Sequence, residues 1–325
     1  MGIEGLGTYL RAKVPRAFVR RPLEGFRGSK MAFDMTLLVC EAFFRNQGDH
    51  GATLRDLTRW TTSLSALDIQ PVFVFDGCTT GSKPRAHKAR TEARKRAAEA
   101  ADTAAVALQE GTLAVSSVGA ALAASDQVAR LRLRASMPTS DLMAAARALV
   151  AAHGAVASAP DDAERLVAHL VATGAVHHGV SKDYDTLAFG APRVILRFPE
   201  EAPEEVVLAT VLEGMGLPSL ASFVDVAILA GCDFTPKIPG IGIVKGLRAI
   251  RQFGSIEAAV THKGLPTPPA DFDFAFARTR FQALPADTVT GIAPAAPVPA
   301  PASGGGGGGG AGHADARPDA AKDKE

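Results

Sequence analysis

Two apolar runs of strand length, each reaching an aspartate, constrain the fold of this chain more than any other feature. Residues 30–40, KMAFDMTLLVC, predict a buried strand that runs into a helix, and residues 70–77, QPVFVFDG, predict a second strand that ends at an Asp-Gly turn. Residues 53–67, between the two runs, have helical periodicity. The order strand, helix, strand is typical of a parallel α/β unit, so we expect an α/β fold.

The same alternation returns in the second half of the chain. Thr139 or Ser140 is expected to cap a helix that continues to His153, before Gly154. The elements predicted after it are a strand at 155–159, a helix at 161–173, strands at 176–180 and 194–198, and a mostly helical stretch at 208–256 that is interrupted at 236–242. The sequence therefore predicts further strands for the same sheet.

Residues 83–134 break this alternation. The stretch 83–96 carries seven basic residues, whereas 97–129 has no Lys or Arg and is rich in alanine. Two helices joined by a turn near 116–119 fit this pattern.

Charge and composition exclude several classes of protein. With 35 Lys plus Arg and 34 Asp plus Glu, the formal charge is +1, which excludes a histone-like nucleic-acid binder and a charge-driven disordered protein. Residues 285–325 are rich in Pro, Ala and Gly and include seven consecutive glycines. Such a segment cannot bury enough apolar surface to offset its chain entropy, so we expect it to be disordered.

Cysteine spacing and hydropathy bear on the cellular setting. The three cysteines are far apart, which argues against a disulfide framework and a zinc site. No run of 18 or more apolar residues is present, so no membrane span is expected. The N-terminal stretch is basic and poor in acids, as in a transit peptide, but its glycines and prolines argue against one. We therefore expect an intracellular protein.

Carboxylates stand at the ends of several predicted strands, where ligands of parallel sheets bind. They are Asp34 in the first strand, Asp76 after the second, Asp162 and Glu164 at the helix start after the third, Asp183 and Asp185 after the fourth, and Asp233 at the end of the later apolar run AILAGCDF.

Each carboxylate also has a plainer interpretation. Asp76 and the glycine after it make a good turn, and the Asp183 loop fits a solvated surface. Glu164 has capping-box spacing from Asp161. Turns alone account poorly for so many acidic strand ends in one small domain. Crowded carboxylates resist ionisation and divalent cations relieve their repulsion, so the pattern predicts a Mg²⁺ site, with two ions about 4 Å apart for phosphodiester chemistry.

Five segments in this order match a known family. MGIEGL, VFVFDG, APDDAE, SKDYDTLAFG and AILAGCDFTPKIPGIGIVKG resemble the XPG-type structure-specific 5′ nucleases, and the flap endonucleases most closely, over about residues 1–281. The resemblance implies a parallel-sheet 5′ nuclease (PIN-like) core with a helical arch and a helix–two-turn–helix element. It also implies Mg²⁺-dependent hydrolysis of a phosphodiester near a junction of single-stranded and duplex DNA, with Mn²⁺ as a substitute ion.

The resemblance assigns roles to the residues of these motifs. The implied ligands of two Mg²⁺ ions are Asp34, Asp76, Asp162, Glu164, Asp183, Asp185 and Asp233. The family carries a lysine seven positions after Asp76 and an arginine seven further, here Lys83 and Arg90. Seven residues are two helical turns, so both cations would face the scissile phosphate from one side of a helix. The alternative is a solvated basic helix face.

DNA-binding positions follow in the same way. Gly240 and Gly242 permit a tight turn whose amides face phosphate oxygens, and Lys245 adds a charge at the start of the next helix. The family binds duplex DNA here without reading its sequence, often with a monovalent cation. The alternative is an ordinary Gly-rich turn. Gly2 is implied to lie near the active site, where its small size permits close approach; the alternative is a frayed terminus.

The sequence departs from the family pattern at several places. Asp162 stands where the family usually has Glu, and Cys40 stands where flap enzymes carry an aromatic that stacks on a base. The arch is rich in alanine and loses positive charge after Arg96. No Q-x-x-(I/L/M)-x-x-aromatic-aromatic motif follows Gln282, which argues against coupling to a sliding clamp.

These observations predict a Mg²⁺-dependent 5′ flap endonuclease, with 5′ exonuclease activity as an additional expectation, that acts on branched or flapped DNA in replication or repair. Two alternatives stay open: an RNA-directed endonuclease of the same family, and a non-catalytic protein that binds DNA junctions. We expect a monomer, located in the nucleus if the source is a eukaryote or a nuclear-replicating virus. The expected regions are 1–82 and 139–284 for the nuclease, 83–138 for the arch and 285–325 for the tail.

Overall fold

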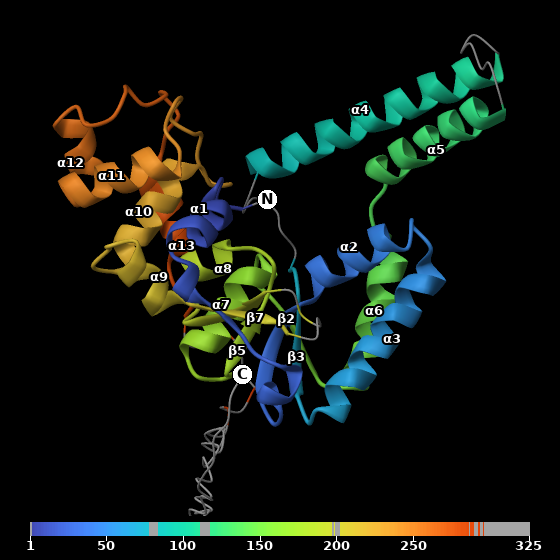
Figure 1. Ribbon diagram of the computed structural model, residues 1–325, viewed down its shortest axis with the longest axis horizontal. Coiled ribbons are helices and arrows are strands. Elements are labelled where there is room, and N and C mark those ends of the chain that lie inside the picture. The colour runs from blue at the N-terminus through green and yellow to red at the C-terminus, as the bar shows by residue number, and fades with distance from the viewer. Residues whose placement is uncertain are drawn as a thin grey trace, which may run out of the picture.

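A mostly parallel sheet forms the centre of the molecule (Figure 1). The computed structural model describes residues 2–77, 84–110, 118–196, 198, 202–285, 287, 288, 292 and 295, and the side chains of 84–87 and 118–121 are not described. The strands in spatial order are β1 (Phe18–Arg20), β7 (Glu204–Val207), β6 (Arg193–Leu196), β5 (His178–Val180), β2 (Lys30–Asp34), β3 (Gln70–Phe75) and β4 (Ala155–Ser158). The pairs from β6 to β4 are parallel, which confirms the predicted α/β fold.

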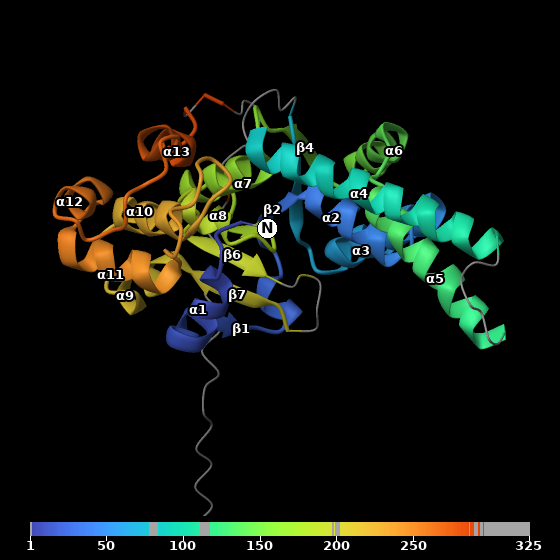
Figure 2. The same cartoon turned by 90° about the horizontal axis from the view of Figure 1, so that it is seen from above.

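Helices cover the sheet on both sides (Figures 1 and 2). The helices are α1 (Leu6–Lys13), α2 (Met35–Arg45), α3 (His50–Ala66), α4 (Pro84–Gln109), α5 (Val118–Ala135), α6 (Ser140–Ala151), α7 (Ala163–Ala172), α8 (Asp185–Ala188), α9 (Leu208–Gly214), α10 (Leu220–Ala230), α11 (Ile243–Phe253), α12 (Ile256–Thr261) and α13 (Phe274–Phe281). None of the helices in the described ranges is long and apolar enough to cross a membrane.

Alternation along the central strands divides the core between the two faces of the sheet. Phe33 of β2 and Phe73 of β3 pack with Trp60 against α2, α3 and α6. Ala32 and Val72, one position earlier in each strand, pack in a separate cluster with α7. Because both faces are buried, the strands read as continuous apolar runs, which is why the sequence reveals them.

Parallel pairing brings the strand ends to one edge of the sheet. In the register of β2 and β3, Asp34 lies opposite Val74, and in that of β3 and β4, Phe75 lies opposite Ser158. Asp34, Asp76 and the start of α7 therefore meet at the same edge. The predicted helix cap after the arch is Thr139, whose side chain accepts a hydrogen bond from the Leu142 amide.

The long helices α4 and α5 form an antiparallel pair that projects from the body (Figures 1 and 2). The two predicted helices are confirmed, although α5 begins at Val118, inside the expected turn at 116–119. Residues 111–117 and most of 285–325, including the glycine run, lie outside the described residues.

The predictions differ from the structure in the second half of the chain. The helical stretch 208–256 is divided into four helices, with breaks at 215–219 and 231–242 as well as at Gly254. Gly216 and Gly231 have φ values of 57° and 115° there, a conformation that glycine adopts without strain. The strand predicted at 176–180 is shortened to β5, and the one predicted at 194–198 begins one residue earlier and ends two residues earlier, as β6. The antiparallel strands β1 and β7 were not predicted.

Strand β7 begins with two buried glutamates, Glu204 and Glu205, which form ion pairs with residues of other strands. Glu205 is 0% exposed and lies 3.2 Å from His178 Nδ1 and 3.1 Å from both Arg193 Nη1 and Arg21 Nη2. Burial by itself would raise the pKa of Glu205, but His178, Arg193 and Arg21 lower it to about 2. The ionised carboxylate therefore stabilises the folded chain.

We predict that Glu205→Gln destabilises the protein at pH 7 by about 3 kcal/mol. Because the pKa falls from an ordinary 4.5 to about 2 on folding, this stabilisation is complete above pH 4.5 and is lost as the pH falls toward 2. The wild type and Glu205→Gln are unfolded in urea at pH 7 and below pH 4.5. The difference in their free energy of unfolding should be smaller at the lower pH. Glu213→Gln, which removes an exposed pair with Arg16 at 3.0 Å, is the control. Equal losses in the two variants would contradict the prediction.

Candidate active site

Asp34 is the carboxylate around which the candidate site is built. It ends β2 and caps α2, with Oδ1 accepting a hydrogen bond of 3.1 Å from the Leu37 amide. The side chain is only 3% exposed. Burial, and after it the charge of Glu164, raise the pKa of Asp34 well above its usual range, with smaller contributions from Asp76 and Asp183. Four predicted ligands from four parts of the chain thus lie near one another.

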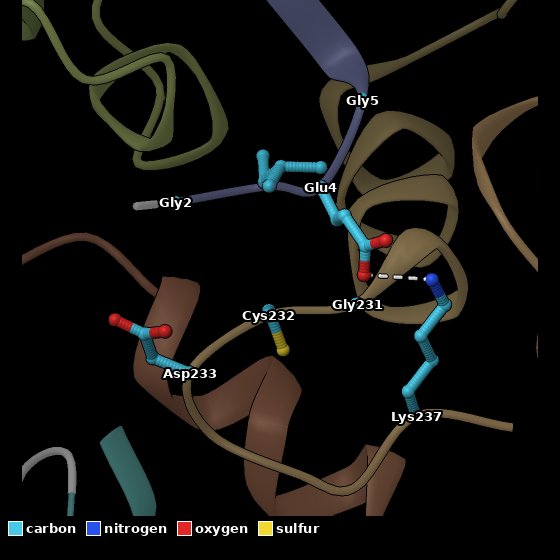
Figure 3. A pocket seen from close by; sticks show the side chains of 8 residues that line it. Gly2, Glu4, Gly5, Gly231, Cys232, Asp233 and Lys237 are labelled. Atoms are coloured by element: carbon cyan, nitrogen blue, oxygen red, sulfur yellow. Dashed lines mark hydrogen bonds and ion pairs between the residues drawn. The ribbon is translucent and has the colours of Figure 1, made fainter. Parts of the chain in front are cut away.

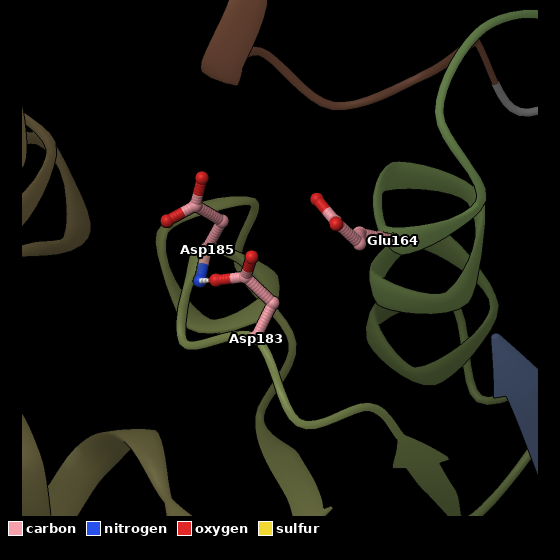
Figure 4. A group of neighbouring side chains, drawn as sticks. All are labelled: Glu164, Asp183 and Asp185. Atoms are coloured by element: carbon pink, nitrogen blue, oxygen red, sulfur yellow. Dashed lines mark hydrogen bonds between the residues drawn. The ribbon is translucent and has the colours of Figure 1, made fainter. Parts of the chain in front are cut away.

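Among the described residues, Glu164, Asp183 and Asp185 form a group of acids that could hold a metal ion (Figure 4). Each offers a carboxylate oxygen, and these three oxygens lie within 4.8 Å of one another. Glu164 comes from the first turn of α7, Asp183 from the loop after β5, and Asp185 is the first residue of α8. The Asp185 amide donates a hydrogen bond of 3.1 Å to Asp183 Oδ1, which fixes one acid relative to the other.

Asp76 and Asp162 stand at the start of α7. Asp76 Oδ1 accepts a hydrogen bond of 2.8 Å from the Ala163 amide, and its own amide donates to Thr36 Oγ1 at 2.9 Å. Asp76 therefore joins the end of β3 to the starts of α2 and α7. Asp162 is the N-cap residue of α7 and is half-buried, without a side-chain capping bond.

The capping box considered for Glu164 is absent. Asp161 lies before the N-cap residue of α7 and instead forms ion pairs with Arg165 at 2.8 Å and Arg280 at 2.9 Å. Glu164 therefore has no capping-box role. Its carboxylate lies among the other acids, as the metal-site interpretation requires.

Asp233 and Arg90 form an ion pair between the body and the helical pair α4–α5. Asp233 lies in the loop after α10, and its Oδ2 is 3.5 Å from Arg90 Nη2 of α4. Burial raises the pKa of the neighbouring Cys232 to about 11, with further contributions from Asp185 and Asp233, so this thiol is not a nucleophile. The predicted cation Arg90 is thus placed beside the acids, while Lys83 lies outside the described residues.

The N-terminal segment and Asp233 line the same cavity (Figure 3). The Ile3 amide donates a hydrogen bond of 2.7 Å to Asp185 Oδ1. A Cβ atom added at Gly2 would lie 2.0 Å from Asp183 Oδ1, and Gly2 has a φ of 101°. Gly2 therefore fits its position through its lack of a side chain. Glu4 forms an ion pair of 2.7 Å with Lys237 across the same cavity.

In the glycine turn before α11, Gly240 is exposed and Gly242 is half-buried. Gly240 has a φ of 76°, and a Cβ atom at Gly240 or Gly242 would meet nothing within 4 Å. Lys245 is also exposed and donates a hydrogen bond of 2.9 Å to the Gly240 carbonyl. An exposed turn with a nearby ammonium group is open to a phosphate backbone.

The donor set of the site fits Mg²⁺. All seven predicted ligands are carboxylates, and oxygen ligands are those that Mg²⁺ prefers. Backbone amides donate to Asp34, Asp76, Asp183 and Asp185, so the carboxylate directions are fixed by the fold. Sequence reasoning missed the amides of Ile3 and Ala163, because no local pattern marks a contact between distant segments.

Comparisons with known proteins agree with this geometry. Models of the XPG N-terminal domain and the XPG I-region match residues 1–97 and 155–233. Flap endonuclease 1 of Leishmania infantum is 30% identical over 307 residues, which cover 87% of this chain and 73% of the relative. The chain belongs to the XPG nuclease family. Flap endonuclease 1 of Zea mays is likewise 30% identical, over 87% of this chain and 75% of the relative.

Solved structures of the family share the fold. Flap endonuclease-1 from Methanococcus jannaschii has a TM-score of 0.56 at 22% identity, over 86% of this chain and 84% of that chain. The catalytic core of Rad2 in complex with DNA substrate has a TM-score of 0.63 at 17% identity, over 89% of this chain and 88% of that chain. As a member of the XPG nuclease family, the chain is a phosphodiester hydrolase.

Proposed function

We propose that this XPG-family nuclease is a Mg²⁺-dependent 5′ flap endonuclease, with additional 5′ exonuclease activity, that cuts DNA where single strand meets duplex. The observation that carries the proposal is the convergence of carboxylates from β2, β3, α7 and the loop after β5 at one edge of the sheet. The flap endonucleases among its relatives support the same substrate class. Replication and repair are the processes in which such junctions arise.

The acids would hold the metal ions. The residues we assign to two Mg²⁺ ions, with Mn²⁺ as a substitute, are Asp34, Asp76, Asp162, Glu164, Asp183, Asp185 and Asp233. When bound, the ions supply a nucleophilic water and neutralise charge on the phosphate. We assign Arg90, whose Nη2 lies 3.5 Å from Asp233 Oδ2, and Lys83 to hold a non-bridging oxygen of the scissile phosphate.

The hairpin and the glycine turn would position the substrate. We assign residues 83–138 to an arch that admits a strand with a free 5′ end, between nuclease regions at 1–82 and 139–284 and before a tail at 285–325. The duplex would lie on Gly240, Gly242 and Lys245, with a monovalent cation at this turn, through contacts with its backbone alone. Backbone contacts carry no sequence information, which suits a substrate that is defined by its shape.

The deciding experiment is cleavage of a 5′-labelled flap duplex. The wild-type protein should release the flap with Mg²⁺ and not with EDTA, and Asp183→Ala should release none. The absence of any Mg²⁺-dependent product, or equal product from both proteins, would overturn the proposal. Single-stranded RNA in the same assay tests the RNA-directed alternative, and retained junction binding without cleavage would identify a non-catalytic binder.

The oligomeric state and the cellular location are part of the same proposal. We propose a monomer that works without a sliding clamp inside the cell, in the nucleus if the source is a eukaryote or a nuclear-replicating virus. Analytical ultracentrifugation of the purified chain checks the monomer.

A further inference from the structure

Lys182 is a cation in the loop between β5 and α8, which also carries the metal-site acid Asp183. It directly precedes Asp183, after the end of β5, and its side chain is 45% exposed. Its Nζ lies 2.7 Å from Oε2 of Glu41, on α2. Neither the family resemblance nor the proposed function assigns a task to this lysine.

The partner Glu41 places Lys182 at the edge of the acidic cluster. Glu41 follows Asp34 by seven residues, which is about two helical turns, so both lie on the same face of α2. Burial raises the pKa of the adjacent Cys40 to about 11, and the charges of Asp34 and Asp76 raise it further. The ion pair therefore connects two walls of the site, the loop after β5 and α2.

The ion pair itself adds little to the stability of the fold. Its partners are 45% and 25% exposed, and pairs of this kind contribute at most about 1 kcal/mol. An ammonium group has three donors, so Lys182 can contact Glu41 and a second acceptor together.

Space for that acceptor lies beside the lysine. Lys182 lines an open cavity of about 340 Å³ together with Tyr184 and Arg11. None of the seven metal-site acids lines this cavity, but Asp183 lies between Lys182 and Tyr184 in the loop after β5. A DNA strand that approaches these acids meets like charge, and a cation at their edge lowers this repulsion.

We propose that Lys182 binds a phosphate of the substrate strand next to the scissile phosphodiester. Lys182 and Arg90 then hold the strand on two sides of the acids, one from the β5–α8 loop and one from α4. Lys182 is a phosphate-contact residue in this proposal, which rests on the proposed function for the identity of the substrate.

The test compares both partners of the ion pair. Affinity for a flap duplex is measured in Ca²⁺ in place of Mg²⁺, to prevent cleavage, at several salt concentrations. Lys182→Ala should bind about tenfold more weakly, and its log-affinity against log-salt slope should be shallower by about 0.7 to 0.9. Glu41→Gln, which frees the lysine, should bind as tightly as the wild type or more tightly, and Lys182→Arg should retain the salt slope.

A matched control removes a cation elsewhere. Arg27 precedes β2 at the opposite edge of the sheet and is paired with Asp68 at 3.9 Å. Arg27→Ala should change neither the affinity nor the salt slope, and thermal unfolding should show that all variants are folded. Equal weakening by Lys182→Ala and Glu41→Gln, or an unchanged salt slope in Lys182→Ala, would overturn the proposal.

The two proposals fail in different ways. A wild-type protein that does not cut the flap overturns the proposed function, whereas the binding comparison still decides whether Lys182 contacts a phosphate. A wild-type protein that cuts the flap while Lys182→Ala binds normally overturns only the role of Lys182.

Discussion

Asp34→Asn is expected to lower the rate of flap cleavage by at least about 100-fold while raising the thermal stability of the metal-free protein. Loss of an outer-shell partner already costs 10- to 100-fold in metal affinity or activity, and Asp34 is assigned as a direct ligand. The buried carboxylate is also opposed by Glu164, Asp76 and Asp183, so asparagine relieves a repulsion. Its amide oxygen can still cap α2 at the Leu37 amide.

The opposite signs of the two effects make the prediction specific. Thermal unfolding without metal should give a higher midpoint for Asp34→Asn than for the wild type, and added Mg²⁺ should stabilise the wild type more. Asp49→Asn is the matched control, because exposed Asp49 caps α3 through a bond of 2.8 Å to the Ala52 amide, outside the cluster. A destabilised Asp34→Asn protein, or one with full activity, would contradict the assignment of Asp34 as a ligand in a strained acidic cluster.

The sequence was sufficient to locate most of the site because the signals are local. Apolar runs mark the strands that are buried on both faces, and parallel pairing carries the residues after them to one edge. Asp34 and Asp76 follow from this rule alone. Their metal-binding roles stay predictions, because a pattern places a carboxylate without showing what it binds.

The parts that sequence missed depend on contacts between distant segments. Strands β1 and β7 are three and four residues long, and the Glu204-Glu205 pair at the start of β7 reads as surface. Both glutamates are buried because arginines from distant positions neutralise them, including Arg11 in α1 at 2.7 Å from Glu204. No local periodicity encodes such a pair.

The contact between the N-terminal residues and the acids also joins segments that are distant in sequence. Ile3 and Asp185 are 182 positions apart and share a hydrogen bond, and Gly2 packs against the Asp183 carboxylate. The resemblance implied that Gly2 lies near the site, but only the structure shows which carboxylate it touches. A substitution that disturbs this contact is therefore expected to lower the rate of cleavage.

Gly2→Ala is expected to lower the flap-cleavage rate by at least about 100-fold with little change in thermal stability. The new Cβ would lie 2.0 Å from Asp183 Oδ1 and 2.8 Å from its Cγ, so the carboxylate or the N-terminal segment must move. A displacement of about 1 Å at a reacting centre can cost 100-fold in rate. Gly2 belongs to none of the buried apolar clusters, so the fold should remain intact.

Gly28→Ala separates this steric effect from backbone strain. Gly28 has a φ of 72° and Gly2 a φ of 101°, so alanine is strained at both positions, but a Cβ atom at Gly28 would meet nothing within 4 Å. Rates are measured at saturating Mg²⁺ on proteins without an N-terminal tag, since a tag would extend the chain into the same space. If Gly2→Ala cleaves as fast as Gly28→Ala, the terminus is free to move away and Asp183 is not positioned by it. If only Gly2→Ala is impaired, the lack of a side chain at Gly2 is what lets Asp183 keep its place among the acids.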